Sequence, residues 1–70
     1  MTADKTLLQM KYARIIALLA EQMSIDEEKA MEIFYNSDTY MLMSKGISDF
    51  HCLSDAYLTE EIILEGKDKI

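Results

Sequence analysis

His51 and Cys52 are adjacent and lie between Asp49 and Asp55, an arrangement that could bind a metal ion or activate a thiolate. Adjacent side chains point about 100° apart on a helix and to opposite faces of a strand, so this pair cannot easily share one ligand geometry. A thiolate–imidazole pair is also usually assembled from distant segments. We therefore expect no metal, cofactor or catalytic residue here. Cys52 is predicted to be a small buried hydrophobe, and His51 to hydrogen-bond a backbone carbonyl or a carboxylate.

Two Ser-Asp pairs, Ser48-Asp49 and Ser54-Asp55, could form a hydroxyl–acid site. Short side-chain oxygens more often accept hydrogen bonds from nearby backbone N–H groups, which caps helices and forms turns. A structural role is therefore favoured for the whole central motif. Its residues are Gly46, Ser48, Asp49, His51, Cys52, Ser54 and Asp55.

The chain has no proline and only two glycines, a composition that favours helices over a turn-rich β-fold. We therefore expect helices to position this motif. Apolar side chains recur every three or four residues from about residue 4 to residue 23, which predicts a first helix. Ser24 and Glu27 have the spacing of a capping box, so a second helix is expected from there to about residue 36.

A short third helix is expected after Ser37 or Asp38, either of which could cap it, and Gly46 is expected to end it in a left-handed conformation. The last helix should begin at Ser54-Asp55 and end near residue 65, with Gly66 as its stop. The sequence thus predicts a single all-α domain over residues 1–70, with three longer helices and one short helix. The expected core is Leu8, Tyr12, Ile15, Leu19, Ile33, Phe34, Leu42, Leu58 and Ile62.

Large apolar residues also lie outside the expected core stripes. A chain of 70 residues buries only about 60% of the surface that it exposes when unfolded, which makes its stability marginal. An oligomer or a partner is one usual aid to stability. The six methionines also suit an adaptable core or contact surface. We therefore predict a homo-oligomer or protein-partner interface. Its candidate residues are Leu7, Met10 and Leu18 on the first helix and Tyr57 and Leu64 on the last.

The net charge of −6 argues against nucleic acid as a partner, because phosphate binding depends on lysine and arginine. Most of the excess negative charge lies in the second half of the chain, where Glu60, Glu61 and Glu65 are expected to form a solvated face. No uncharged run approaches the ~20 residues that span a bilayer, and Lys11 and Arg14 interrupt the apolar run of residues 7–20. With a lone cysteine, a cytoplasmic location is expected.

Nearly the whole chain resembles a group of short bacterial proteins of unknown function. The resemblance is carried by Gln9, Lys11, Tyr12, Ala13 and Arg14, by Phe34, Tyr35 and Ser37, by Tyr40, Leu42, Met43, Gly46, Ile47, Ser48, Asp49, His51, Cys52, Ser54, Asp55, Tyr57 and Leu58, and by Glu60 and Glu61. Genes for such proteins are associated with neighbours that resemble ADP-ribosyltransferase toxins. The resemblance therefore implies an accessory or antitoxin-like role and supplies no catalytic residues.

The first functional hypothesis is a non-enzymatic protein–protein interaction module. An alternative is a transcriptional regulator of helix-turn-helix type, although a basic recognition helix is missing. The third is a small enzyme or metal protein centred on His51 and Cys52, which would require these residues to meet Asp49 and Asp55 in one pocket.

Overall fold

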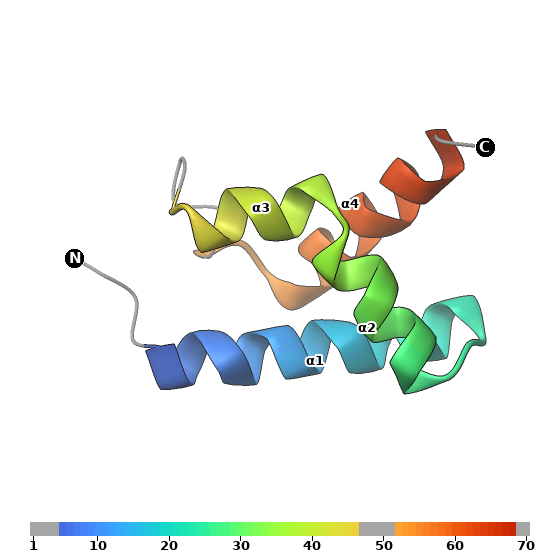
Figure 1. The fold of residues 1–70 in the computed structure, drawn as a ribbon, viewed down its shortest axis with the longest axis horizontal. Coiled ribbons are helices and arrows are strands. Elements are labelled where there is room, and N and C mark those ends of the chain that lie inside the picture. The colour runs from blue at the N-terminus through green and yellow to red at the C-terminus, as the bar shows by residue number, and fades with distance from the viewer. Residues whose placement is uncertain (1–4, 47–51, 69–70) are drawn as a thin grey trace.

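Four helices form the protein in the computed structural model, which describes residues 5–46 and 52–68. They are α1 (Lys5–Met23), α2 (Glu27–Tyr35), α3 (Asp38–Ser44) and α4 (Asp55–Asp68). The predicted all-α bundle of three longer helices and one short helix is therefore confirmed. Figure 1 shows α1 along one side of the molecule, α3 along the other, and α2 crossing between them in front of α4. Helix α1 packs against α2 and α4, and α3 packs against the same two helices.

The corner between α1 and α2 differs from the predicted capping box. Ser24 has a φ of 56°, and the Ile25 N–H donates to the Ala20 carbonyl at 3.0 Å. Ser24 thus occupies the left-handed position that follows a helix, where its backbone cannot also serve as an extended N-cap. Asp26 takes that role instead, because its carboxylate accepts from the Lys29 N–H at 2.7 Å.

Helix α3 begins and ends as predicted. The Ser37 hydroxyl accepts from the Tyr40 N–H at 3.1 Å and donates to the Phe34 carbonyl at 2.6 Å, which makes it the N-cap. After the helix, Gly46 has a φ of 67°, and its N–H donates to the Met43 carbonyl at 3.1 Å. A Cβ built on Gly46 would meet no atom within 4 Å, so backbone conformation rather than crowding favours glycine here.

Helix α4 begins as predicted but ends later. The Ser54 hydroxyl accepts from the Tyr57 N–H at 3.1 Å, which confirms the cap. The predicted stop at Gly66 is wrong, because α4 continues through it to Asp68. A glycine ends a helix only where the backbone turns left-handed, and inside a helix it merely costs about 1 kcal/mol relative to alanine.

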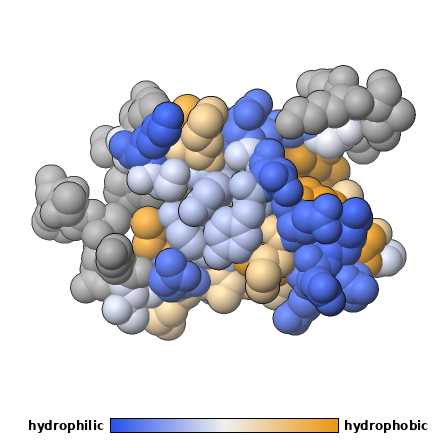
Figure 2. Space-filling model, in the orientation of Figure 1, coloured by the Kyte–Doolittle hydropathy of each residue, from blue (hydrophilic) through white to orange (hydrophobic). Residues whose placement is uncertain are grey.

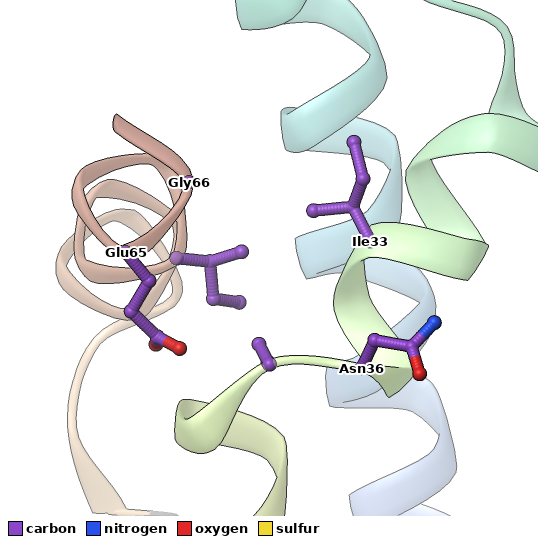
Figure 3. Close-up of a pocket in the computed structure, with 6 residues that line it drawn as sticks. Ile33, Asn36, Glu65 and Gly66 are labelled. Carbon is purple, nitrogen blue, oxygen red and sulfur yellow. The ribbon is translucent and has the colours of Figure 1, made fainter. Parts of the chain in front are cut away.

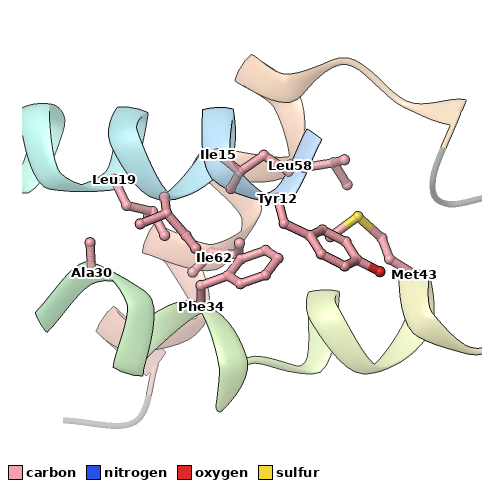
Figure 4. Close-up of a cluster of buried hydrophobic side chains, with 9 residues drawn as sticks. Tyr12, Ile15, Leu19, Ala30, Phe34, Met43, Leu58 and Ile62 are labelled. Atoms are coloured by element: carbon pink, nitrogen blue, oxygen red, sulfur yellow. The ribbon is translucent and has the colours of Figure 1, made fainter. Parts of the chain in front are cut away.

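The core takes side chains from all four helices, as Figure 4 shows. Its members are Tyr12, Ile15, Ile16, Leu19, Ala30, Phe34, Met43, Leu58 and Ile62. Six of the predicted core residues are among them. Leu8 and Ile33 pack against the core while partly exposed, and the prediction for Leu42 is wrong. Leu42 is only half-buried because Met43, the next residue on α3, points about 100° away from it and faces the core.

Candidate functional site

The central motif is only partly covered by the structure. Ser48, Asp49 and His51 lie outside the described residues, so the predictions made for them stay predictions. Cys52 is exposed, and its expected burial is therefore wrong. It lies just before the cap of α4, in a turn whose neighbouring residue Leu53, and not Cys52, packs against the core.

Asp55 has partners that sequence reasoning missed. Its two carboxylate oxygens accept from Lys11 Nζ and Arg14 Nε, each at 2.6 Å. Lys11 also donates to the Leu53 carbonyl at 2.7 Å, so one side chain of α1 holds both the turn and the first residue of α4. A signal was available in the sequence. Lys11 and Arg14 are one turn apart, and neither has an acidic residue three or four positions away on its own helix. An acidic partner for them therefore had to come from another helix.

These contacts fix the charge of Asp55. Burial acts to raise the pKa of this carboxyl, but the hydrogen bonds and positive charges of Lys11 and Arg14 outweigh burial and lower the pKa. Asp55 also lies in the first turn of α4, where the helix dipole favours a negative charge. The group is therefore a structural carboxylate that docks α4 onto α1.

A second carboxylate, Glu65, docks α4 onto α3. Its Oε1 accepts from the Asp38 N–H at 2.7 Å and its Oε2 from the Thr39 N–H at 3.1 Å, and the Thr39 hydroxyl also donates to it. The prediction that Glu65 belongs to a solvated face is thus wrong. The first turn of α3 has N–H groups without partners inside the helix, and Glu65 satisfies two of them.

A hollow of about 190 Å³ lies beside Glu65, where the ends of α2, α3 and α4 meet. Figure 3 shows Glu65 and Gly66 on its α4 side and Ile33 and Asn36 on its α2 side. Because the Glu65 carboxylate is already bonded to α3, this hollow offers an incoming ligand no unoccupied charged group among its lining residues.

Aromatic side chains cluster where α1, α2 and α3 meet. The cluster consists of Tyr12, Phe34, Tyr35 and Tyr40. Five pairs of these rings have centroids 4.8 to 5.5 Å apart, and each pair is tilted or edge to face. Burial, followed by the nearby phenol groups of Tyr40 and Tyr35, raises the pKa of Tyr12. Tyr12 is therefore neutral near pH 7, and the cluster is an apolar support with hydroxyl edges.

A larger hollow, of about 240 Å³, lies between α1 and α2 beside this cluster. Its lining residues are Gln9, Tyr12, Ala13, Ile16, Glu27, Met31 and Tyr35. Figure 2 shows ring side chains at the centre of the face that α1, α2 and α3 form, with apolar surface beside them and a strongly hydrophilic area over α2. We call this feature the α1–α2 hollow.

Four of the five residues predicted to form an interface are exposed. Leu7, Met10, Tyr57 and Leu64 are exposed, and Leu18 is half-buried. Sequence reasoning missed three further apolar side chains that lie on the surface, Met31, Tyr35 and Met41. Altogether these large exposed hydrophobic side chains are between 42% and 65% exposed. The interface itself stays a prediction.

Two further observations concern the described residues. Within them, no three or more histidine, cysteine or acidic side chains are grouped so that they could hold a metal ion. None of the helices in the described ranges has the length and apolarity needed to cross a bilayer.

The fold defines this protein as a small all-α domain in which two carboxylates of the last helix are bonded to the first and third helices. The chain matches no family model, and no curated protein or solved structure is significantly similar to it.

Proposed function

We propose that this chain is a non-enzymatic protein–protein interaction module with an accessory or antitoxin-like role. The observation that supports it is the amount of exposed apolar surface on so small a domain. Among residues 5–46 and 52–68, seven large hydrophobic side chains are exposed, whereas the buried core has nine members. Contiguous exposed apolar patches on a stable protein often mark a surface that binds another chain.

The placement of these side chains on their helices supports the predicted interface. Leu7 and Leu18 are close to three full turns apart on α1, and Met10 follows Leu7 by one turn, so one side of α1 carries all three. Tyr57 and Leu64 are two turns apart on one side of α4. Stripes of this kind suit contact with a partner element along a helix.

Three polar contacts of α4 lie within the fold. Asp55 is bonded to α1 and Glu65 to α3, while the pKa of Tyr57 is raised by the nearby charge of Glu61 and a hydrogen bond to it. The antitoxin-like role is supported by the sequence resemblance, since a short non-catalytic neighbour of a toxin would act through a binding surface.

Light scattering over a range of protein concentrations tests the interaction module. Leu64→Gln and Tyr57→Gln should weaken self-association or partner binding and leave the helical circular dichroism unchanged, because both side chains are exposed. Glu60→Gln, an exposed change on the same helix, is the control. A protein that stays monomeric and retains no partner in cells would contradict the proposal.

Co-expression tests the antitoxin-like role. The chain should restore growth to cells that produce an ADP-ribosyltransferase-like toxin encoded beside its gene, as the resemblance implies, and Leu64→Gln should reduce this protection. Unchanged killing in the presence of the folded wild-type chain would contradict that role.

A further inference from the structure

The α1–α2 hollow is mainly apolar, small and bordered by negative charge. Its volume of about 240 Å³ is below the ~300–1,000 Å³ of small-molecule sites. It can therefore hold a protruding side chain better than a whole metabolite. Met31 and Tyr35 lie one turn apart on α2 and are both exposed, so they form a ridge along one edge of the hollow.

The charged residues around this ridge are glutamates. Glu27 lines the hollow, one turn before Met31. Glu28 precedes Met31 by three positions and Glu32 precedes Tyr35 by three, which places each of them beside the ridge, and both are exposed. Among the residues that line the hollow none is basic. Lys29, the basic residue of α2, is 3.8 Å from Glu32 and offsets only part of this charge.

These observations decide between two occupants. A second copy of the chain, docked face to face through this surface, would bring the same three glutamates of both copies together, and like charges across an interface are unfavourable. A segment with lysine or arginine would meet complementary charge instead. A helix presents an apolar anchor with flanking side chains one turn away on either side, which matches the spacing of Met31, Tyr35 and the glutamates.

We propose that the α1–α2 hollow binds a cationic amphipathic helix of another protein, with a large apolar side chain inserted beside Met31 and Tyr35 and lysine or arginine residues facing Glu27, Glu28 and Glu32. The inference rests on the proposed function in that the chain acts by binding proteins. It adds a second surface, distinct from the predicted interface on α1 and α4, and the chemistry of its partner.

Calorimetric titration of the full chain with three synthetic peptides tests this proposal. The first is an amphipathic helix of leucine and lysine, the second replaces every lysine with glutamate, and the third has the composition of the first in an order without an apolar face. The first should bind, more weakly as salt is raised, because salt screens surface charge. The other two should bind at least tenfold more weakly.

Paired variants locate the binding surface. Met31 is 47% exposed and Met41, on α3, is 44% exposed, so Met31→Gln and Met41→Gln remove similar surface at different places. Met31→Gln should weaken binding of the first peptide about tenfold, as expected for a central anchor contact, and Met41→Gln by less than about twofold. Glu28→Gln combined with Glu32→Gln should weaken binding more than Glu21→Gln combined with Glu60→Gln, since Glu28 and Glu32 flank the ridge on α2 whereas Glu21 and Glu60 belong to α1 and α4.

Three results would overturn the inference: equal binding of the peptide without an apolar face, equal binding of the acidic peptide, or equal effects of the two methionine variants. Loss of binding in Leu64→Gln but not in Met31→Gln would also overturn it, while leaving the interaction module itself supported. Failure of the whole module would appear separately, as a monomer without any partner in light scattering and in cells.

Discussion

Glu65 on α4 accepts a hydrogen bond from the backbone N–H of Asp38 on α3 at 2.7 Å, across a sequence separation of 27 residues. The same carboxylate accepts from the Thr39 N–H at 3.1 Å. The first turn of α3 is thus capped twice, by Ser37 from its own segment and by Glu65 from another helix. A helix of seven residues is too short to be stable alone, so this tertiary cap helps to hold α3 in place.

Replacing Glu65 with alanine should lower the free energy of unfolding by about 1–2 kcal/mol, because two backbone N–H groups lose a charged acceptor. The midpoint of urea denaturation measures this change. Glu60→Ala removes an exposed carboxylate from the same helix and should cost less than about 0.5 kcal/mol. Equal effects of the two substitutions would mean that Glu65 is no cap.

Asp55 should make stability depend on pH in the acidic range. Its pKa in the folded protein is below the ordinary value of 3.8, so folding favours the ionised form. Its contribution is complete above the unfolded-state pKa and is lost as the pH falls through the lower pKa of the folded state. Asp55→Asn should therefore destabilise by about 1–2 kcal/mol at pH 7, and the gap between the unfolding curves of mutant and wild type should close below about pH 4.

The two cations that hold Asp55 should differ in importance. The Lys11 side chain is 14% exposed and that of Arg14 is 54% exposed. Solvent weakens the Arg14 pair, whereas Lys11 also loses its bond to the Leu53 carbonyl when it is replaced. Thermal unfolding should show a larger loss for Lys11→Gln than for Arg14→Gln, and the reverse order would contradict this account of the docking.

The two glycines should respond to alanine in opposite directions. Gly46 has a φ of 67°, which strains any residue with a Cβ, so Gly46→Ala should destabilise and Gly46→Val should cost at least ~1 kcal/mol. Gly66 lies inside α4 with open space around it, and Gly66→Ala should stabilise by up to about 1 kcal/mol. Denaturant midpoints provide the comparison, and unchanged stability in Gly46→Val would refute its role as a helix stop.

Ser24→Gly separates the observed corner from the capping box that the sequence predicted. In the left-handed position after α1, glycine should raise stability by up to about 1 kcal/mol, because the penalty of a Cβ at a φ of 56° disappears. If Ser24 were the cap of α2, the substitution would bring no gain. Asp26→Ala should cost about 1 kcal/mol, since Asp26 is the residue that accepts from the Lys29 N–H.

The sequence predicted those parts of the fold that depend on local patterns. The apolar spacing of α1 identified Tyr12, Ile15 and Leu19 as core residues, and the types of Ser37 and Gly46 identified the limits of α3. Local rules were insufficient where two neighbours competed for one role. Ser24 and Asp26 both suit a cap, and the left-handed exit of α1 decided between them.

Contacts between distant residues could not be predicted in the same way. Asp55 and Glu65 both resemble ordinary helix-surface acids in the sequence, and their partners lie 26 to 44 residues away. The α1–α2 hollow likewise depends on how two helices meet, because Gln9 and Ala13 come from one helix and Met31 and Tyr35 from the other. Exposure of Cys52 was missed for a related reason. Cysteine is usually buried, but in the turn before α4 the neighbouring Leu53 packs against the core and Cys52 is left exposed.

All four helices contribute to the same buried cluster, and this has a consequence for how the protein opens. Loss of α4 removes Leu58 and Ile62 from the core together with both docking carboxylates, so the remaining helices would retain no complete core of their own. Partial unfolding should therefore be nearly as costly as complete unfolding, and the domain should behave as one cooperative unit. Slowly exchanging amides in different helices should then report the same free energy of opening, equal to that of global unfolding.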